Sequence, residues 1–93
     1  MAVYEDYIIN SNIKIRKFSK DVLISELEWH RDKFNRYIEI LSGEGWFFQM
    51  EDCLPIELVK GDYLFIPAAT YHRIKRGSTD LIIKIIEHSK RIA

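Results

Sequence analysis

Short stretches of alternating apolar and polar residues recur along this chain, and polar turns separate them. The clearest is Ile13–Phe18, where isoleucines alternate with basic residues before a final phenylalanine. Alternation places neighbouring side chains on opposite faces of an extended chain, so it predicts a β-strand. Further strands are predicted at residues 22–29, 36–41, 46–50, 55–59, 63–66, 71–75 and 81–86. This series of short strands at regular spacing predicts an all-β sandwich or barrel.

Two polar turns predict where hairpins form. Ser19-Lys20-Asp21 lies between the first and second predicted strands, and Ser42-Gly43-Glu44-Gly45 lies between the third and fourth. The glycines of the second turn can adopt positive φ, as tight turns require. Residues 20–34 have some helical potential, but they lack a sustained 3.6-residue period and a clear cap at the end, so we expect strand structure there.

Length and composition set the scale of the fold. The chain has 93 residues, of which 47% are apolar, and no repeat or linker divides it, so we expect one domain covering residues 1–93. The single cysteine, Cys53, excludes an internal disulfide and a multi-thiolate zinc site. A domain of this size buries roughly 60–65% of the surface that its unfolded chain exposes, so a second subunit would add stability. We therefore expect a homodimer.

Charge narrows the choice of partners. Fourteen Lys and Arg residues balance 14 Asp and Glu residues, so the chain has no net basic field and nucleic acid is not an expected partner. The basic residues Lys14, Arg16 and Lys17 are expected on a solvated strand face. Glu5 and Asp6 stand where a signal peptide would be basic, and no apolar run approaches the roughly 20 residues that span a bilayer. We expect a cytoplasmic protein with no membrane partner.

The polar residues around His30 are the first candidates for chemistry. Residues two apart on a strand share a face, so Glu26, Glu28 and Asp32 are expected beside His30. Carboxylates beside a histidine are costly to bury unless they bind a cation, accept hydrogen bonds or pair with a base. Arg36 then begins a strand face that is otherwise aliphatic. The pattern predicts a charged site in this part of the chain.

The twelve residues from Gly61 to His72, GDYLFIPAATYH, resemble the second sequence signature of the cupin superfamily, G-x5-P-x-G-x2-H-x3-N. Gly61, Pro67 and His72 match its spacing, whereas Ala69 stands at the second glycine and Arg76 at the asparagine.

The first cupin signature, G-x5-H-x-H-x3,4-E-x6-G, is matched more loosely. His30 stands at the first histidine, Asp32 at the second and Arg36 at the glutamate, while Gly43 matches the final glycine. The resemblance covers roughly residues 22–87. It implies a double-stranded β-helix, or jelly-roll barrel, with its open end near these residues and His72.

The resemblance also implies a metal site. Cupins with the full set of residues bind a divalent metal through three histidines and a glutamate. Carried over residue by residue, His30 and His72 are metal ligands and Asp32 is a third. Two histidines and a carboxylate suit one ion of Fe, Mn, Ni or Zn. Arg36 opposes this interpretation, because a guanidinium at the glutamate position stays charged and repels a dication unless it pairs with a carboxylate.

Two other interpretations stay open. In the first, no metal is needed: Arg36 holds the carboxylate or phosphate of a small-molecule ligand, and His30 and His72 hydrogen-bond the rest of it in a sensor or carrier pocket. Glu28 and Gln49 are further candidate ligand-binding residues. In the second, the barrel is structural, Asp32 and Arg36 neutralise each other, and the histidines are hydrogen-bonded core residues. The sequence leaves catalysis open.

Overall fold

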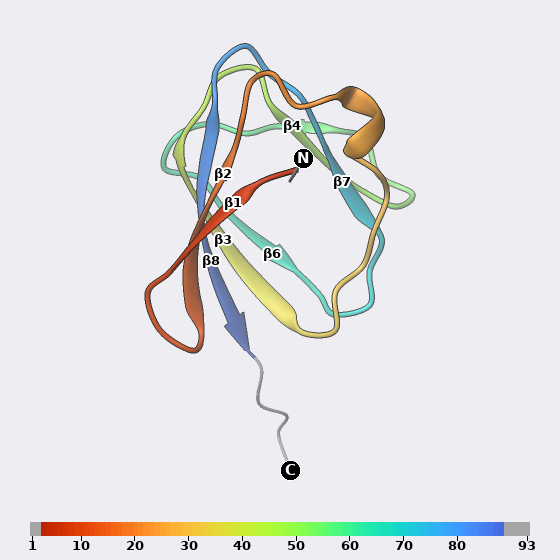
Figure 1. The fold of residues 1–93 in the computed structure, drawn as a ribbon. Coiled ribbons are helices and arrows are strands. Elements are labelled where there is room, and N and C mark those ends of the chain that lie inside the picture. The colour runs from red at the N-terminus through yellow and green to blue at the C-terminus, as the bar shows by residue number, and fades with distance from the viewer. Residues whose placement is uncertain (1–2, 89–93) are drawn as a thin grey trace.

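The computed structural model describes residues 3–88, which form β-strands joined by loops (Figure 1). The strands are β1 (Glu5–Ile8), β2 (Ile13–Phe18), β3 (Asn35–Ser42), β4 (Phe47–Met50), β5 (Ile56–Glu57), β6 (Tyr63–Ile66), β7 (His72–Lys75) and β8 (Leu81–His88). A single 3-10 turn, Ile24–Glu26, lies between β2 and β3. The prediction of an all-β fold is confirmed. Within residues 3–88, no helix has the length and apolar character to cross a membrane.

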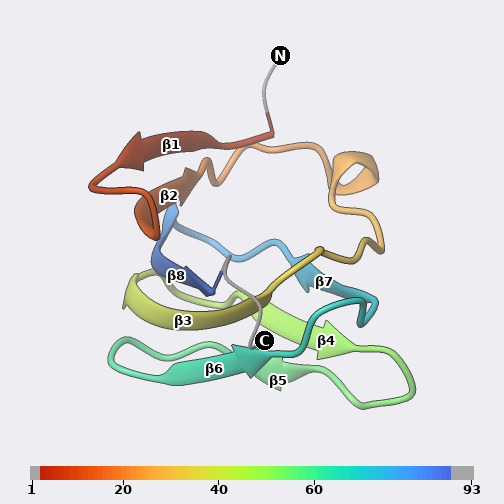
Figure 2. The same ribbon diagram turned by 90° about the horizontal axis from the view of Figure 1, so that it is seen from below.

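The strands form two antiparallel sheets. The larger has the order β1-β2-β8-β3-β6 and the smaller the order β5-β4-β7. Seen from below, the larger sheet forms one wall, and β4 and β7 form part of the other (Figure 2). The core between them consists of Phe18, Val22, Ile38, Ile40, Trp46, Phe48, Leu58, Ile66, Leu81, Ile83 and Ile85.

Strand β8 lies in the middle of the larger sheet because its sequence suits burial on one face. Leu81, Ile83 and Ile85 point into the core and are almost fully buried. The alternation of burial along this strand matches the two-residue period of side chains in a sheet. β8 pairs with β2 on one side and β3 on the other, so it connects the two halves of the sheet.

The expected strand at residues 22–29 is wrong. The apolar residues at its start, 22–24, are consecutive rather than alternating. The chain forms the 3-10 turn there, with the Glu26 N–H donating to the Leu23 carbonyl at 3.0 Å. Val22 is buried in the core, whereas Leu23 and Ile24 are exposed. The segment crosses the end of the barrel from β2 toward β3 (Figure 1).

Both predicted hairpins are also wrong. β2 pairs with β1 and β8, and β3 pairs with β6 and β8. β4 lies in the other sheet, because the turn before it carries the chain from one layer to the other. Gly43 and Gly45 in that turn have φ values of 142° and 77°, and Trp46 after it is completely buried. The glycines thus allow a change of sheet rather than a tight hairpin.

The prediction that Arg16 lies on a solvated face of β2 is also wrong. Arg16 points inward and is 7% exposed. Its guanidinium donates two hydrogen bonds to the Asp6 carboxylate, from Nε at 2.7 Å and from Nη2 at 2.9 Å. The Arg16 guanidinium also lies 3.6 Å from the centre of the Tyr4 ring. A fork of this kind compensates the burial of the charge, so the basic side of β2 faces the barrel interior.

Candidate metal and ligand site

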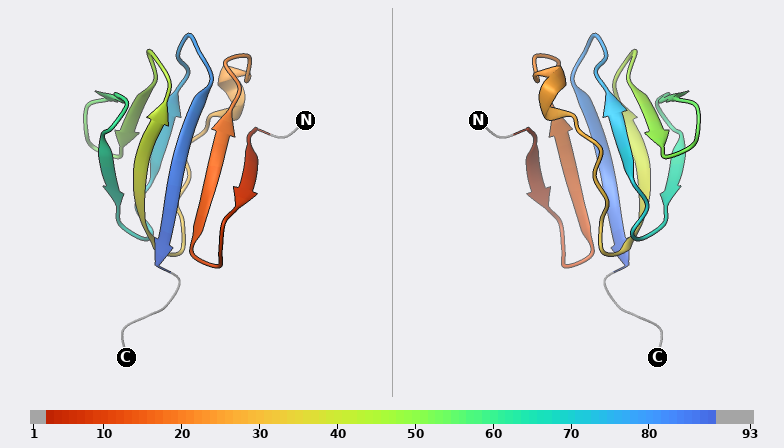
Figure 3. Two further views of the ribbon diagram at one scale, coloured as in Figure 1. Left: turned by 90° about the vertical axis from the view of Figure 1, so that its left-hand side faces the viewer. Right: turned by 90° about the vertical axis from the view of Figure 1, so that its right-hand side faces the viewer.

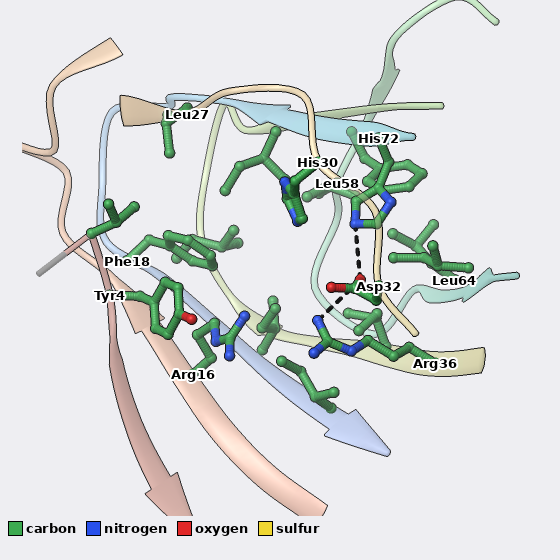
Figure 4. Close-up of a pocket in the computed structure, with 18 of the residues that line it drawn as sticks. Tyr4, Arg16, Phe18, Leu27, His30, Asp32, Arg36, Leu58, Leu64 and His72 are labelled. Carbon is green, nitrogen blue, oxygen red and sulfur yellow. Dashed lines mark ion pairs between the residues drawn. The ribbon is translucent and has the colours of Figure 1, made fainter. Parts of the chain in front are cut away.

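A cavity of about 360 Å³ occupies the barrel interior between the two sheets. Its walls are mainly core side chains, and polar groups gather at one end, as Figure 4 shows. The polar and charged residues that line it are Arg16, Glu26, Glu28, His30, Asp32, Arg36 and His72. An apolar cavity with a few converging polar groups is the usual form of a small-molecule site.

His30 and His72 are brought together by their backbones. The His30 N–H donates to the His72 carbonyl at 3.0 Å, and the His72 N–H donates back to the His30 carbonyl at 2.8 Å. This isolated bridge joins the loop before β3 to the first residue of β7. The two imidazole centres are 4.3 Å apart. The His72 ring is buried, whereas His30 is an exposed residue that also lines the cavity.

Each imidazole is oriented by a backbone carbonyl two residues earlier. Nδ1 of His72 lies 2.8 Å from the Thr70 oxygen, and Nδ1 of His30 lies 3.1 Å from the Glu28 oxygen. A carbonyl only accepts, so each Nδ1 donates its proton, and in the neutral ring Nε2 carries the lone pair. Outer hydrogen bonds of this type orient metal-ligating histidines.

Asp32 completes the cluster. Its Oδ2 atom lies 3.3 Å from Nε2 of His72 and 3.2 Å from Nη1 of Arg36. This oxygen is buried, and among the described residues it has no hydrogen-bond partner of good geometry. Burial raises the pKa of Asp32, but the contact with His72 and the positive charges of Arg36 and the histidines outweigh it and hold the pKa below its ordinary value. Asp32 is therefore an ionised acceptor with unused capacity.

Arg36 is held by two carboxylates. Its Nε donates to Oε2 of Glu87 at 2.8 Å, and its Nη1 faces Asp32 (Figure 4). Glu87 is the residue opposite Arg36 in the β3–β8 register, so the sheet itself supplies this partner. The pairing meets the condition under which Arg36 does not exclude a metal, because two carboxylates neutralise its charge.

The residues present fit a divalent metal. Ligand atoms of His30, Asp32 and His72 all lie within 4.8 Å of one another. Neighbouring ligands of a tetrahedral or octahedral centre, bonded at about 2.0–2.2 Å, lie roughly 3.0–3.6 Å apart, and the separation of Nε2 of His72 from Oδ2 of Asp32 is within that range. Two nitrogens and one oxygen are an acceptable donor set for Fe, Mn, Ni or Zn.

The second cupin signature shapes the loops around this cluster. Gly61 and Ala69, at its two glycine positions, have φ values of 93° and 60°, where a residue without a Cβ is favoured. The Ala69 N–H donates to the Asp32 carbonyl at 2.7 Å, which ties the loop before β7 to the backbone of Asp32. The positive φ at position 69 explains why glycine suits it.

Of the other two predicted ligand-binding residues, Glu28 lines the cavity and Gln49 does not. Glu28 lines the cavity at its exposed rim, as does Glu26. Gln49 is not among the residues that line it. Its amide oxygen accepts from Nε of Arg73 at 3.0 Å, and its Nε2 donates to the Cys53 carbonyl at 2.9 Å. The neighbouring Phe48 is the residue of β4 that reaches the cavity.

Arg16 and Tyr4 line the cavity, and the sequence reasoning missed them. The signal was present in part, because Arg16 alternates with the isoleucines of β2. Alternation does not say whether the arginine or the isoleucines of β2 face inward. That orientation depends on β1, since Asp6 supplies the ion-pair partner that compensates the burial of Arg16.

Comparisons with known proteins show the fold. No family model and no curated protein matches the sequence. An RmlC-like cupin family protein with a double-stranded β-helix fold from Methanocaldococcus jannaschii matches with a TM-score of 0.69 at 17% identity, covering 94% of this chain and 79% of that chain. A cupin domain from Bordetella pertussis Tohama I matches with a TM-score of 0.64 at 14% identity, covering 95% and 94%. The iron(II) form of HppE matches with a TM-score of 0.69 at 10% identity, covering 91% of this chain and 48% of that one.

These likenesses extend over nearly the whole chain and show that it has the cupin double-stranded β-helix fold. The fold expected from residues 61–72 is confirmed. At these identities the comparison establishes architecture, and one fold hosts many activities.

Proposed function

We propose that this protein binds one divalent metal ion through His30, Asp32 and His72, and a small polar or anionic molecule beside Arg36. The observation that carries the proposal is the pair formed by Nε2 of His72 and Oδ2 of Asp32, 3.3 Å apart in a buried position. When the imidazole is neutral with its proton on Nδ1, both atoms are acceptors, and two buried acceptors repel each other unless a proton or a metal cation lies between them. A metal ion supplies that cation.

The ligand part of the proposal rests on Arg36 and on the shape of the cavity. Nε and Nη1 of Arg36 face Glu87 and Asp32, and within the described residues no hydrogen bond engages Nη2. A guanidinium with free N–H groups beside an apolar cavity is suited to a carboxylate, phosphate or carbonyl oxygen. The cavity volume fits a small molecule.

A bound metal would supply Lewis-acid polarisation of a ligand oxygen. Arg36 would orient the ligand and the apolar walls would exclude water. Glu28 and Glu26, which are exposed residues that line the cavity, are the carboxylates that could accept a proton. The iron(II) form of HppE, which shares this fold, supports metal chemistry as a use for such a barrel.

A metal-free ligand pocket is the second candidate, because one observation favours it. Nη1 of Arg36 lies 3.2 Å from the Asp32 oxygen that would ligate the metal. If a proton on His72 Nε2 supplies the cation instead, Asp32 is satisfied by His72 and Arg36 together. The barrel is then a sensor or carrier of small anions.

Metal content measured by elemental mass spectrometry decides between them. The protein is purified without a chelator or histidine tag and then incubated separately with Fe(II), Mn(II), Ni(II) and Zn(II). We expect close to one metal per chain for one of these ions. The variants H30A and H72A should each lose it, while H88A, which removes an exposed histidine outside the site, should keep it. No bound metal in any condition, or equal loading of H72A and the parent, overturns the metal site.

The ligand part has a separate test. Thermal unfolding is followed with acetate, phosphate and succinate at increasing concentration, for the parent and for R36Q. An increase in melting temperature with at least one anion, lost in R36Q, supports the pocket. Equal shifts in both proteins overturn the role of Arg36.

A further inference from the structure

The outward surface of the larger sheet is apolar. We use the name apolar face for the outward side chains of Ile13, Ile15, Tyr37, Tyr63, Phe65 and Ile86, which come from β2, β3, β6 and β8. Tyr37, Tyr63 and Phe65 are 46%, 70% and 44% exposed, and the three isoleucines are half-buried. The orientation of β2 contributes to this face: Arg16 points inward, and the isoleucines of β2 therefore point outward.

Strand register arranges the apolar face in two rows. Ile13, Ile86, Tyr37 and Phe65 are successive partners across β2, β8, β3 and β6. In the adjacent row, Tyr7 of β1 and then Ile15 stand at one end and Tyr63 at the other, and Lys84 of β8 and Glu39 of β3 lie between them. The rings of Tyr37 and Phe65 are 4.9 Å apart, so the aromatic end of the face is continuous.

No described segment covers this face. In the left view of Figure 3 the five strands of the larger sheet face the viewer, and β4 and β7 lie behind them. The outward side of the smaller sheet differs, since Gln49, Arg73 and Lys75 give it polar character. Contiguous apolar patches on one side only are typical of protein interfaces.

Lys84 and Glu39, in the middle of the face, are direct register partners within one chain, and their arrangement also fits a second copy of this chain. A rotation of 180° about an axis parallel to the strands, between β8 and β3 and in the plane of contact, places β8 of one copy opposite β3 of the other. Lys84 then faces the partner's Glu39, Ile86 faces the partner's Tyr37, and Ile13 faces the partner's Phe65. An axis across the strands would instead place Lys84 against the partner's Lys84.

From this arrangement we propose that the apolar face is the interface of a homodimer, with Lys84 and Glu39 forming two symmetric ion pairs at its centre. A two-fold interface uses the same patch on both subunits, so it must be self-complementary. This patch meets that requirement in charge, because each lysine faces a glutamate. It also meets it in side-chain type, because aliphatic side chains of β2 and β8 would pack on aromatic side chains of β3 and β6 of the other copy. The proposal is independent of what the cavity binds.

Sedimentation equilibrium on the parent and on two charge variants tests the packing. We expect the parent to be a dimer at micromolar concentration. K84E and E39K should each dissociate at least about tenfold more readily, because like charges then meet at the centre. When K84E and E39K are mixed, each new charge meets its opposite across the interface, and the mixture should recover the dimer. Within each single chain the two positions keep like charges, so recovery can come only from the partner.

Every outcome bears on the proposal. A monomeric parent, single variants that dimerise like the parent, or a mixture that stays monomeric each overturns it. K75E, on the outward side of the smaller sheet, is the matched control and should leave the dimer unchanged. Far-UV circular dichroism establishes that each variant is folded. If a charge variant fails to fold, F65R replaces it, because this exposed side chain faces the partner's Ile13 and its substitution should also produce monomers.

Discussion

His30 and His72 are held together by two reciprocal backbone hydrogen bonds, and their rings meet only as a consequence. The position of each imidazole therefore depends on the loop backbone and on the carbonyl that fixes its Nδ1 atom. Removal of either side chain leaves the bridge intact, so site chemistry and fold stability can be separated.

The two histidines should differ in their effect on stability. H30A removes an exposed ring and should change the free energy of unfolding by less than about 0.5 kcal/mol. H72A removes a ring that is 4% exposed and packs against Phe48, with the centroids 5.8 Å apart, so it should cost about 1–3 kcal/mol. Urea denaturation of metal-free protein measures both. Equal costs would contradict the different burial of the two rings.

Arg36 competes with a metal for Asp32, so R36Q should bind metal more tightly. The substitution removes a positive charge that lies 3.2 Å from Oδ2 of Asp32. We expect the dissociation constant for Zn(II) or Mn(II) to fall by roughly tenfold, which corresponds to the loss of one partly screened charge repulsion. Titration against a chromophoric chelator measures it, with K75Q as a control that removes a distant charge. An unchanged constant would refute the competition.

The pKa of Asp6 makes part of the stability depend on pH. The hydrogen bonds from Arg16 lower this pKa, burial opposes them, and the charges of Arg16, Lys14 and Arg36 lower it again, so the net direction is down. A carboxyl with a lowered pKa in the folded state stabilises fully above its unfolded pKa of about 3.9, and this contribution is lost as pH falls through the lower folded value.

D6N should therefore be less stable than the parent at pH 7, by about 1–2 kcal/mol, and the difference should shrink below about pH 4. Denaturation at pH 7, 5, 4 and 3 measures the trend. D21N changes an exposed aspartate and serves as the control. A constant difference at all four values would show that the fork with Arg16 does not depend on the ionisation of Asp6.

Ala69 is the one residue of the second signature whose side chain opposes its backbone conformation. With φ at 60°, its Cβ is disfavoured, so A69G should stabilise the fold by about 0.5–1 kcal/mol. A68G, at a neighbouring position without positive φ, should instead destabilise it by a similar amount. Thermal unfolding compares the two variants. Destabilisation by A69G would contradict the strain.

The sequence predicted the cluster through spacing rather than through strand assignment. His72 follows Gly61 and Pro67 at the intervals of the second cupin signature, and the resemblance of this short segment was enough to predict the fold and to single out His72. His30 and Asp32 were found although the strand expected to carry them is a loop. Their convergence depends on the backbone bridge to His72, which joins residues 42 positions apart and leaves no local trace in the sequence.

The local sequence does not show which side chains of a strand point into the core. Alternation in β2 and β4 divides the residues into two sets, but it does not say which set faces the core. Arg16 points inward because Asp6 on β1 forms a fork with it, and Gln49 points away from the cavity because Phe48 fills the core. In each case the energy that decides the orientation comes from a neighbouring strand.

By itself the sequence determined the all-β class and most of the strands, since these follow from alternation and turn residues, although it did not predict β1 and placed a strand wrongly at residues 22–29. The cupin fold followed from the resemblance of residues 61–72 to a cupin signature. Only the tertiary structure decided the strand partners, the shared position of Asp32 between His72 and Arg36, and the outward direction of the isoleucines of β2. These depend on contacts between segments distant in sequence, and their free energy exists only when the two sheets have packed against each other.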